Sequence, residues 1–383
     1  MKKILVLHTN YRDIGGEDIA VKNEVELLKK YYEVKTVYFS NNISNYFKQG
    51  ISFIFNNDKK SVEILKNELQ QFNPDIVYVH NTWFKASLGI FKLLEKQNVK
   101  TILKLHNFRY DCTKSLLSST HFKDTSICRA CGQNKESVGF FNRYYEGDLL
   151  KSIAMLRYGK KYFDIIKNSK IKIFVLTNFH LNYLKKLSIN ENKLEIFPNF
   201  LRNIEAKERT SVDNYIVYAG RISKEKGIEE LIESFLSLDL KDIKLKIIGD
   251  GPMYKELSKK YSEFNIQFLG QISNPQVITV MTNARAVVTA TKLYEGQPTL
   301  LCEASMLGVP SIYPKTGGIS DFFPPDYDLS FEQFNYEDLK EKLKLLTKDD
   351  YINLEGKKNK NFIEQYLNEE KLINEFDRII NES

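Results

Sequence analysis

Two glutamates, Glu295 and Glu303, lie eight positions apart in the run TKLYEGQPTLLCEASMLGVP. Pro298 between them favours a helix start, because its fixed φ suits the first turn and its missing N–H needs no partner there. A helix beginning near Pro298 carries Glu303 about a turn and a half inside and leaves Glu295 in the preceding loop. Two carboxylates beside the free N–H groups of a helix start suit a ligand with sugar hydroxyls and a phosphate. A helix with an ordinary acidic residue is the simpler alternative.

A cationic pair follows the apolar run at 215–219. Gly220 makes a turn, and Arg221 and Lys226 lie on the loop that leads into the next helical pattern. Arginine can grip phosphate oxygens with two N–H groups, and lysine adds a point charge. The pair therefore predicts a diphosphate site, with two solvent-exposed cations on a loop as the alternative.

The first half of the chain offers weaker candidates. Gly15 and Gly16 follow the first apolar run and precede a helical pattern, where they would let the backbone approach a ligand closely. His106 follows the fourth apolar run, at the point where a strand should end. His8 and His80 occupy analogous positions, and a lone histidine of this kind is often structural.

These residues follow short β-rich runs that alternate with helical patterns. Strands are expected at 3–8, 34–39, 76–80, 101–105, 171–176, 194–197, 215–219, 244–248, 266–269, 286–289 and 309–313. Helices are expected at 19–31, 62–72, 85–97, 150–167, 227–236, 253–261, 275–283 and 298–307, with helical patterns from Tyr336 onwards. Apolar strands with helical crossovers indicate parallel sheets covered on both faces, whose ligands gather at the carboxyl ends of the strands.

The length of 383 residues exceeds one ordinary core and predicts two domains. We expect an α/β protein of two doubly wound Rossmann-like domains that face each other across a cleft. The first domain spans 1–200 and binds the acceptor, and the second spans 201–365 and binds the donor. Residues 366–383 are expected to form a C-terminal helix that packs back on the first domain.

Composition favours a soluble globular protein, with 42% hydrophobic and 27% charged residues. The start MKKILVLHTNYRDIGG reads as a buried strand, because a secretory signal needs a longer apolar core. We therefore expect a cytoplasmic protein. The net charge of +7 divides into +13 for residues 1–200 and −6 for the rest. A basic half attracts phosphates or anionic lipid heads; a solvated lysine-rich surface is the alternative, and no nucleic-acid-binding module is evident.

The joint pattern resembles the retaining GT-B glycosyltransferases of family 4. The matching elements are the Gly15–Gly16 loop, His106, the Arg221–Lys226 pair, the GDGP turn at 249–252 and the Glu295-to-Glu303 pair. The stretches GGEDIAVKNEVELL, LHNFRYDC and CRAC look like a bacterial subgroup tied to surface-polysaccharide assembly. The resemblance spans nearly the whole chain, and the C-terminal half is its specific part.

The resemblance implies a metal-independent hexosyltransferase. It would move a sugar, with retention, from a UDP- or GDP-linked donor to a hydroxyl of a glycan or polyprenyl-diphosphate-linked acceptor. The pathway would be the synthesis of bacterial capsule, lipopolysaccharide O-antigen or exopolysaccharide. A GT-B nucleotide-sugar epimerase and a non-catalytic nucleotide-sugar binding protein are the alternatives.

The resemblance also implies roles for individual residues. The expected catalytic residues are His106, Glu295, Arg221 and Lys226. The expected donor site comprises Gly15, Gly16, Gly220, Arg221, Lys226, Glu295, Gly296, Gln297, Pro298, Thr299 and Glu303. Glu303 would hold the ribose hydroxyls and Glu295 the donor sugar, while the cations and the helix start stabilise the leaving diphosphate. No residue is a clear nucleophile, so same-face substitution fits better than double displacement.

Three clustered cysteines raise the question of a metal. Cys112, Cys128 and Cys131 supply three thiolates, whereas a closed zinc site needs four ligands. The family typically has a further cysteine where this chain has Tyr144. Candidates for the fourth ligand are His106, His121 and Cys302. We expect no cofactor and no metal, with structural zinc as the less favoured alternative.

The segment Met155–Lys170 mixes aromatic and basic residues. This pattern suits a lipid-phosphate-linked acceptor and peripheral contact with the cytoplasmic face of the inner membrane. An amphipathic helix packed on its sheet explains the pattern equally well.

Overall fold

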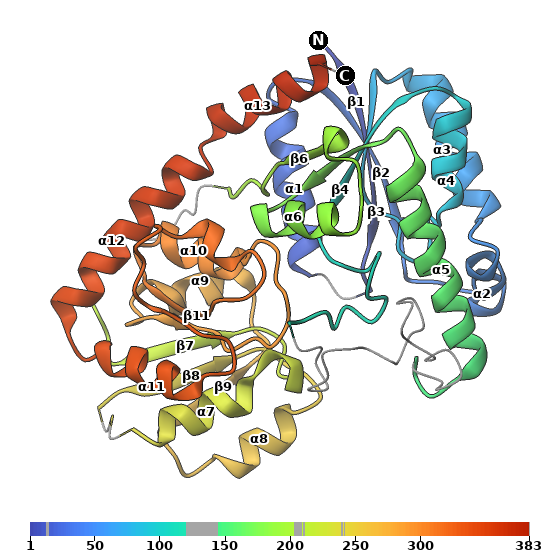
Figure 1. The fold of residues 1–383 in the computed structure, drawn as a ribbon. Coiled ribbons are helices and arrows are strands. Elements are labelled where there is room, and N and C mark those ends of the chain that lie inside the picture. The colour runs from blue at the N-terminus through green and yellow to red at the C-terminus, as the bar shows by residue number, and fades with distance from the viewer. Residues whose placement is uncertain are drawn as a thin grey trace. The chain divides into compact units, whose positions relative to one another are not determined.

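The computed structural model describes residues 1–12, 15–119, 145–202, 209, 211–238, 240 and 242–382, with Lys48 described by its backbone only. The chain divides into two compact units: an N-terminal unit of Met1–Leu201 with Glu369–Ser383, and a C-terminal unit of Arg202–Asn368. Each unit holds one six-stranded sheet in which the paired strands run parallel (Figure 1). The α/β class with two doubly wound sheets, predicted from the alternating pattern, is confirmed.

The N-terminal sheet has the order β2-β1-β3-β4-β5-β6. Its strands are β1 (Lys3–Asn10), β2 (Glu33–Ser40), β3 (Ile76–Asn81), β4 (Lys100–Leu105), β5 (Lys172–Val175) and β6 (Leu194–Ile196). Its helices are α1 (Gly16–Leu28), α2 (Tyr46–Ile54), α3 (Lys59–Phe72), α4 (Gly89–Lys96), α5 (Leu149–Asn168), α6 (Asn178–Lys186) and α13 (Glu369–Glu382). Because β1 and β3 are neighbours, the strand order reverses between them.

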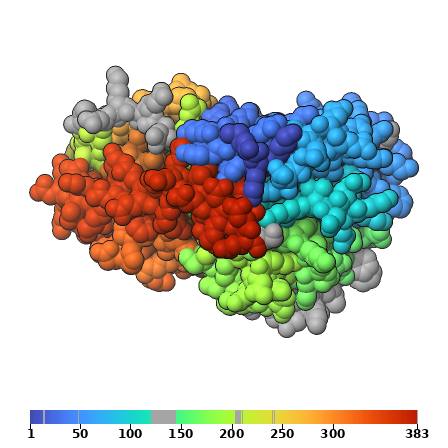
Figure 2. Space-filling model, turned by 90° about the horizontal axis from the view of Figure 1, so that it is seen from above, coloured from blue at the N-terminus to red at the C-terminus, as the bar shows by residue number. Residues whose placement is uncertain are grey.

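Both faces of this sheet are apolar, as expected for a doubly wound unit. Figure 1 shows α1 and α13 on one face and α3, α4 and α5 on the other. The stripe of α13 that contains Leu372, Phe376 and Ile380 is buried in the same core as β1, β3 and α1. Lys2 donates its Nζ to the carbonyl of Ile380 at 3.3 Å, and Figure 2 shows the red C-terminal helix against the dark-blue start of the chain.

A buried ion pair fixes α1 to the strands beneath it. The Nζ of Lys104 on β4 lies 2.7 Å from Oε2 of Glu24 on α1, and both side chains are almost wholly buried. The hydroxyl of Tyr78 on β3 donates to Oε1 of the same glutamate at 2.5 Å. Removal of one member of such a pair typically costs about 3–5 kcal/mol, because the other charge stays buried. This contact therefore sets α1 relative to the carboxyl ends of β3 and β4.

The C-terminal sheet has the order β12-β11-β10-β7-β8-β9. Its strands are β7 (Tyr215–Ala219), β8 (Lys244–Ile248), β9 (Ile266–Gly270), β10 (Val287–Val288), β11 (Ser311–Pro314) and β12 (Ser330–Phe331). Its helices are α7 (Ile228–Leu236), α8 (Tyr254–Lys260), α9 (Asn274–Thr282), α10 (Thr299–Met306), α11 (Tyr336–Leu345) and α12 (Asp349–Tyr366). The strand order reverses between β7 and β10, so this is the point where such sheets bind ligands.

The structure differs from the sequence prediction in some local details. The helices α2 and α6 and the short strand β12 were not anticipated. Helix α1 starts at Gly16 with Gly15 as its N-cap, and Pro298 is the N-cap of α10 instead of a residue in its first turn. Among the helices of the described residues, none has both the length and the apolarity needed to cross a bilayer.

Candidate active site

The loops after β7 and β10 meet at the reversal point of the C-terminal sheet. Lys226 ends a short 3-10 turn (Lys224–Lys226) after β7, and Glu295 lies in the loop after β10. The Nζ of Lys226 lies 2.5 Å from Oε1 of Glu295. Thr291 donates its hydroxyl to the same carboxylate oxygen at 3.0 Å. The structure thus brings together two of the predicted catalytic residues, as an ion pair across the position where a ligand is expected.

The ion pair of Lys226 and Glu295 can open. Both side chains retain about 30% of their exposure (30% and 29%). An ion pair that water reaches contributes only about 0–1 kcal/mol, because solvent screens the attraction. A diphosphate carries more negative charge than one carboxylate, so it can replace Glu295 as the partner of Lys226.

Two glycines bring the loops of this site close together. Gly227 has a φ of +65° and a side chain there would meet the carbonyl oxygen of Ala290 at 2.0 Å. Gly317 has a φ of +58° and a Cβ would meet the carbonyl oxygen of Glu295 at 2.3 Å. Gly318 then donates its N–H to that carbonyl at 2.8 Å. The backbone N–H of Gly318 therefore holds the Glu295 loop in place.

The GDGP turn at 249–252 supports the loop that carries Arg221. The N–H of Gly220 binds the carbonyl of Ile248 at 3.0 Å, and the N–H of Ile222 binds the carbonyl of Asp250 at 2.9 Å. Arg221, between these anchored residues, is exposed. Within the described part of the chain its side chain makes no ion pair. The structure thus presents Arg221 on a fixed loop with its guanidinium available for an anion.

Helix α10 places the second glutamate apart from the first. Gly296 and Gln297 precede the N-cap Pro298, and Thr299 is the first helical residue. Glu303 is partly buried one turn inside, and burial raises its pKa to about 7, against the smaller opposing effect of a hydrogen bond with the Asn274 side chain. In the described residues the Glu303 carboxyl interacts with Asn274 and not with Lys226 or Glu295.

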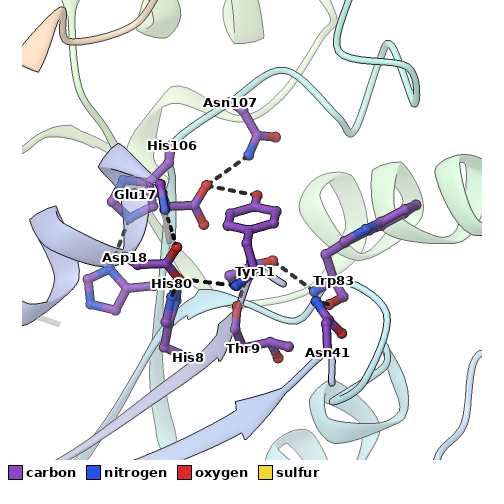
Figure 3. Close-up of polar contacts among 12 residues, drawn as sticks. His8, Thr9, Tyr11, Glu17, Asp18, Asn41, His80, Trp83, His106 and Asn107 are labelled. Atoms are coloured by element: carbon purple, nitrogen blue, oxygen red, sulfur yellow. Dashed lines mark hydrogen bonds and ion pairs between the residues drawn. The ribbon is translucent and has the colours of Figure 1, made fainter. Parts of the chain in front are cut away.

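Three histidines gather at the reversal point of the N-terminal sheet (Figure 3). His8, His80 and His106 lie on or directly after β1, β3 and β4. Nδ1 of His80 is 3.0 Å from Nε2 of His106, and the two rings stack at 5.3 Å. Burial lowers the pKa of all three, for His80 and His106 well below the usual value. His80 and His106 are therefore neutral near pH 7, and one ring donates to the other.

The hydrogen-bond pattern favours one pair of tautomers. Nε2 of His80 is buried and has no hydrogen-bond partner among the described residues. A buried N–H without a partner is rarer than a buried acceptor without one, so we assign the proton of His80 to Nδ1. His80 then donates to Nε2 of His106, which leaves the proton of His106 on Nδ1.

Carboxylates from the start of α1 complete this edge. Asp18 lies 2.8 Å from Nε2 of His8 through Oδ1 and accepts the N–H of Gly15 through Oδ2, also at 2.8 Å. Glu17 accepts from the hydroxyl of Tyr11 at 3.0 Å and from Nδ2 of Asn107 at 3.2 Å (Figure 3). Burial raises the pKa of Glu17 to about 7.

The sequence analysis did not single out these carboxylates, although they directly follow the two glycines. Neither Gly15 nor Gly16 has a positive φ, and a Cβ on Gly16 would meet nothing within 4 Å. Their expected role in ligand approach stays a prediction.

Of the three clustered cysteines, Cys112 is described, buried and free. Cys128 and Cys131 lie outside the described residues, as do His121 and Tyr144.

Comparison with known proteins finds a family that the C-terminal part of the chain resembles. Residues 200–369 match the family described as Glycosyl transferases group 1. This range is less than half of the chain, and through these residues the chain is similar to the group 1 glycosyltransferases. The matched range contains Arg221, Lys226, Glu295 and Glu303.

Relatives of this glycosyltransferase extend over most of its length. An uncharacterized glycosyltransferase of Methanocaldococcus jannaschii is 24% identical and covers 95% of this chain and 94% of its own. The amylovoran biosynthesis glycosyltransferase AmsD of Erwinia amylovora is 23% identical over 82% of this chain and 80% of its own.

Solved structures match this chain over its whole length. Sucrose-phosphate synthase of Thermosynechococcus elongatus has a TM-score of 0.72 at 15% identity and covers 100% of this chain and 99% of its own. Anabaena HepE in complex with UDP-glucose has a TM-score of 0.69 at 12% identity and covers 100% of both chains. These similarities establish the GT-B fold for this glycosyltransferase.

Proposed function

We propose that this glycosyltransferase moves a hexose from a UDP- or GDP-linked donor to a hydroxyl of a glycan or lipid-linked glycan, with retention at the anomeric carbon. The proposed pathway is bacterial capsule, O-antigen or exopolysaccharide synthesis, in the cytoplasm. The observation that carries the proposal is the partly exposed ion pair of Lys226 and Glu295 beside the exposed Arg221, which makes no ion pair with a described residue. The relative named for amylovoran biosynthesis and the neighbour solved with UDP-glucose support the acceptor and donor classes.

We call the site formed by the loops after β7 and β10 the C-terminal edge. Donor binding there replaces Glu295 by the diphosphate as the partner of Lys226. The diphosphate attracts Lys226 and Arg221, and the N–H groups at the start of α10 add to the positive field. Glu295 loses its lysine partner and becomes free to accept hydroxyls of the donor sugar. The negative charge that develops on the leaving diphosphate is then stabilised by the protein's own cations, which supports transfer that needs no metal.

Glu303 is the proposed contact for the ribose of the donor. Its pKa of about 7 means that the carboxyl is partly protonated at neutral pH before the donor arrives. Ribose hydroxyls donate to a carboxylate most strongly when it is ionised. Donor binding should therefore lower the pKa of Glu303.

Retention is proposed to follow from substitution on one face of the sugar. The acceptor oxygen forms a bond to the anomeric carbon while the bond from that carbon to the phosphate oxygen breaks. The acceptor proton passes to the departing phosphate oxygen, so no enzyme base is needed. No carboxylate is assigned as a nucleophile: Glu303 interacts with Asn274, and Glu295, after Lys226 has turned to the diphosphate, still accepts the Thr291 hydroxyl and binds hydroxyls of the donor sugar.

We call the carboxyl ends of β1, β3 and β4, with the start of α1, the N-terminal edge. This edge is proposed to bind sugar hydroxyls. With the tautomers assigned above, His106 offers the N–H of Nδ1 as a hydrogen-bond donor. Glu17, with its pKa of about 7, lies on the same edge and can accept a hydroxyl proton when ionised. These are directional contacts that select among hydroxyls.

The proposal is tested by turnover of a panel of nucleotide sugars with extracts of lipid-linked and free glycans, read by mass spectrometry. The anomeric configuration of the product is then read by NMR, with and without a chelator. We expect transfer with retention in both conditions. Inversion, loss of activity in chelator, or conversion of a donor alone into its epimer would contradict the proposal.

A further inference from the structure

Helix α2 exposes an apolar stripe that nothing in the described structure covers. Phe53 faces inwards and stacks on Tyr158 of α5 at 5.1 Å. On the opposite side, Phe47 is 82% exposed, and Ile51 and Ile54 are 43% and 42% exposed. The intervals of four and three residues place these three side chains on one helical face. A folded protein in water rarely leaves such a stripe open unless it binds something.

The stripe continues into a groove between helices of the same unit. Phe55, which directly follows α2 and is 70% exposed, also lines a groove of about 730 Å³. Val62 of α3 and Leu88 and Leu93 beside or on α4 give the groove an apolar floor. Figure 1 shows α2, α3, α4 and α5 as neighbours on one flank of the N-terminal sheet.

The walls of the groove are strongly basic. They contain one carboxylate, Asp164, and five cations: Lys92, Lys96, Arg157, Lys160 and Lys161. All five cations are exposed, and none makes an ion pair with a described residue. An uncompensated cluster of this size holds a positive potential that attracts phosphate groups.

We propose that α2 and this groove form a docking surface for an anionic lipid bilayer. The stripe of Phe47, Ile51, Ile54 and Phe55 enters the boundary between headgroups and acyl chains, and the cations of α4 and α5 bind lipid phosphates. An anionic membrane can bury the exposed apolar residues and attract the cations beside them. The proposal does not depend on the donor site, which lies in the other unit.

Other occupants fit this surface less well. A second copy of the chain would bring like charges together at the groove, which is unfavourable. A soluble phosphate would satisfy the cations and leave the apolar stripe in water. The bilayer is the partner that satisfies both sets of residues at once.

The test is co-sedimentation of the full chain with vesicles of phosphatidylcholine containing roughly one-third phosphatidylglycerol. Binding is expected at low salt and should fall steeply when the salt is raised toward about 0.5 M. The triple variant Lys92→Gln/Lys96→Gln/Lys161→Gln should weaken binding about 100-fold. The double variant Phe47→Ser/Phe55→Ser should weaken it at least about tenfold.

Matched controls come from exposed residues of the C-terminal unit. Phe264 and Leu354 are 52% and 53% exposed, and the pair Phe264→Ser/Leu354→Ser should leave vesicle binding unchanged. The triple variant Lys244→Gln/Lys255→Gln/Lys259→Gln should change it less than threefold, which controls for net charge.

Three results would overturn the proposal. One is no binding of the wild-type chain to the anionic vesicles at low salt. Another is equal loss of binding in the control and groove variants. A third is release of the protein by inorganic phosphate well beyond the effect of chloride at equal ionic strength, which would identify a phosphate pocket instead. Donor turnover with a soluble acceptor is measured in parallel, so that failure of docking and failure of catalysis are told apart.

Discussion

The two sheet edges share one topology and differ in chemistry. Each edge lies where the strand order reverses, between β1 and β3 in one unit and between β7 and β10 in the other. The C-terminal edge carries exposed or half-exposed charges, Arg221, Lys226 and Glu295. The N-terminal edge carries neutral rings, with the buried His80 joined to the partly buried His106 by a hydrogen bond. A charged leaving group needs mobile cations, whereas sugar hydroxyls need directional donors and acceptors.

Each edge nevertheless contains one carboxyl whose pKa burial raises to about 7. These are Glu17 in the N-terminal unit and Glu303 in the C-terminal unit. The shared cause is desolvation, which disfavours the charged form. The difference lies in the partners: Tyr11 and Asn107 bind Glu17, while Asn274 binds Glu303.

The largest expected effect is the loss of kcat when Lys226 of the C-terminal edge is replaced. Lys226→Ala should lower kcat about 100- to 1000-fold, because a cation that stabilises the leaving diphosphate is lost. Lys224→Ala, an exposed lysine on the same turn, is the matched control and should change kcat by less than about threefold. Steady-state kinetics with the natural donor measures both. Equal losses in the two variants would mean that general charge, and not the position of Lys226, matters.

A smaller effect is expected from the backbone that holds Glu295. Gly317→Ala places a Cβ 2.3 Å from the Glu295 carbonyl, so the loop must shift and kcat should fall about tenfold or more. Gly308→Ala has a similar φ of +70° but meets nothing nearer than Lys360 at 4.0 Å. Gly308→Ala should lose about 1 kcal/mol of folding stability from its positive φ alone, and Gly317→Ala should lose more because the backbone must also move; denaturant unfolding measures both. Only Gly317→Ala should lose activity.

The neutral edge is probed through His80, which we assign as a positioning residue for His106. His80→Phe keeps a ring but removes the donor to Nε2 of His106, and should cost about tenfold in kcat/KM. His80→Asn retains an N–H near the position of Nδ1 and should recover most of the activity. A purely structural role for His80 would instead give equal loss of activity and of melting temperature in both variants.

The smallest effect is a pH dependence at Glu303. If the ionised carboxyl binds the ribose, the KM for the donor should rise as the pH falls below about 7, and Glu303→Gln should flatten this profile. The raised pKa also means that the folded chain keeps this proton when the unfolded chain has lost it. The contribution of Glu303 to stability therefore declines as the pH rises from about 4.5 towards 7. A donor KM that stays constant from pH 6 to 8, on either side of the pKa of about 7, would argue against the ribose contact.

The sequence predicts long buried strands well and short elements poorly. The expected strands at 215–219 and 244–248 have the same limits as β7 and β8, because their apolar runs are continuous and bounded by turns. Helix α2 has only nine residues and contains Gly50 in its interior, and a glycine there weakens the helical pattern. Strand β12 has only two residues, Ser330 and Phe331, and lacks the continuous apolar run that marks the equally short β10 (Val287–Val288).

Pairings between distant residues are also beyond a single sequence. Lys226 and Glu295 were predicted to act at the same site, but their direct contact depends on β7 lying beside β10. The stacking of His80 on His106 likewise depends on β3 lying beside β4. Strand ends can be recognised one by one, whereas the order of strands in a sheet is set by packing of the whole unit.

The position of α13 has a consequence for synthesis on the ribosome. Phe376 and its neighbours fill the core of the N-terminal unit, yet they are translated after the whole C-terminal unit. The nascent N-terminal unit must therefore wait, with an uncovered apolar surface, while a complete second sheet emerges and folds. Chaperone capture should accordingly persist until α13 has left the ribosome and packed on the N-terminal unit.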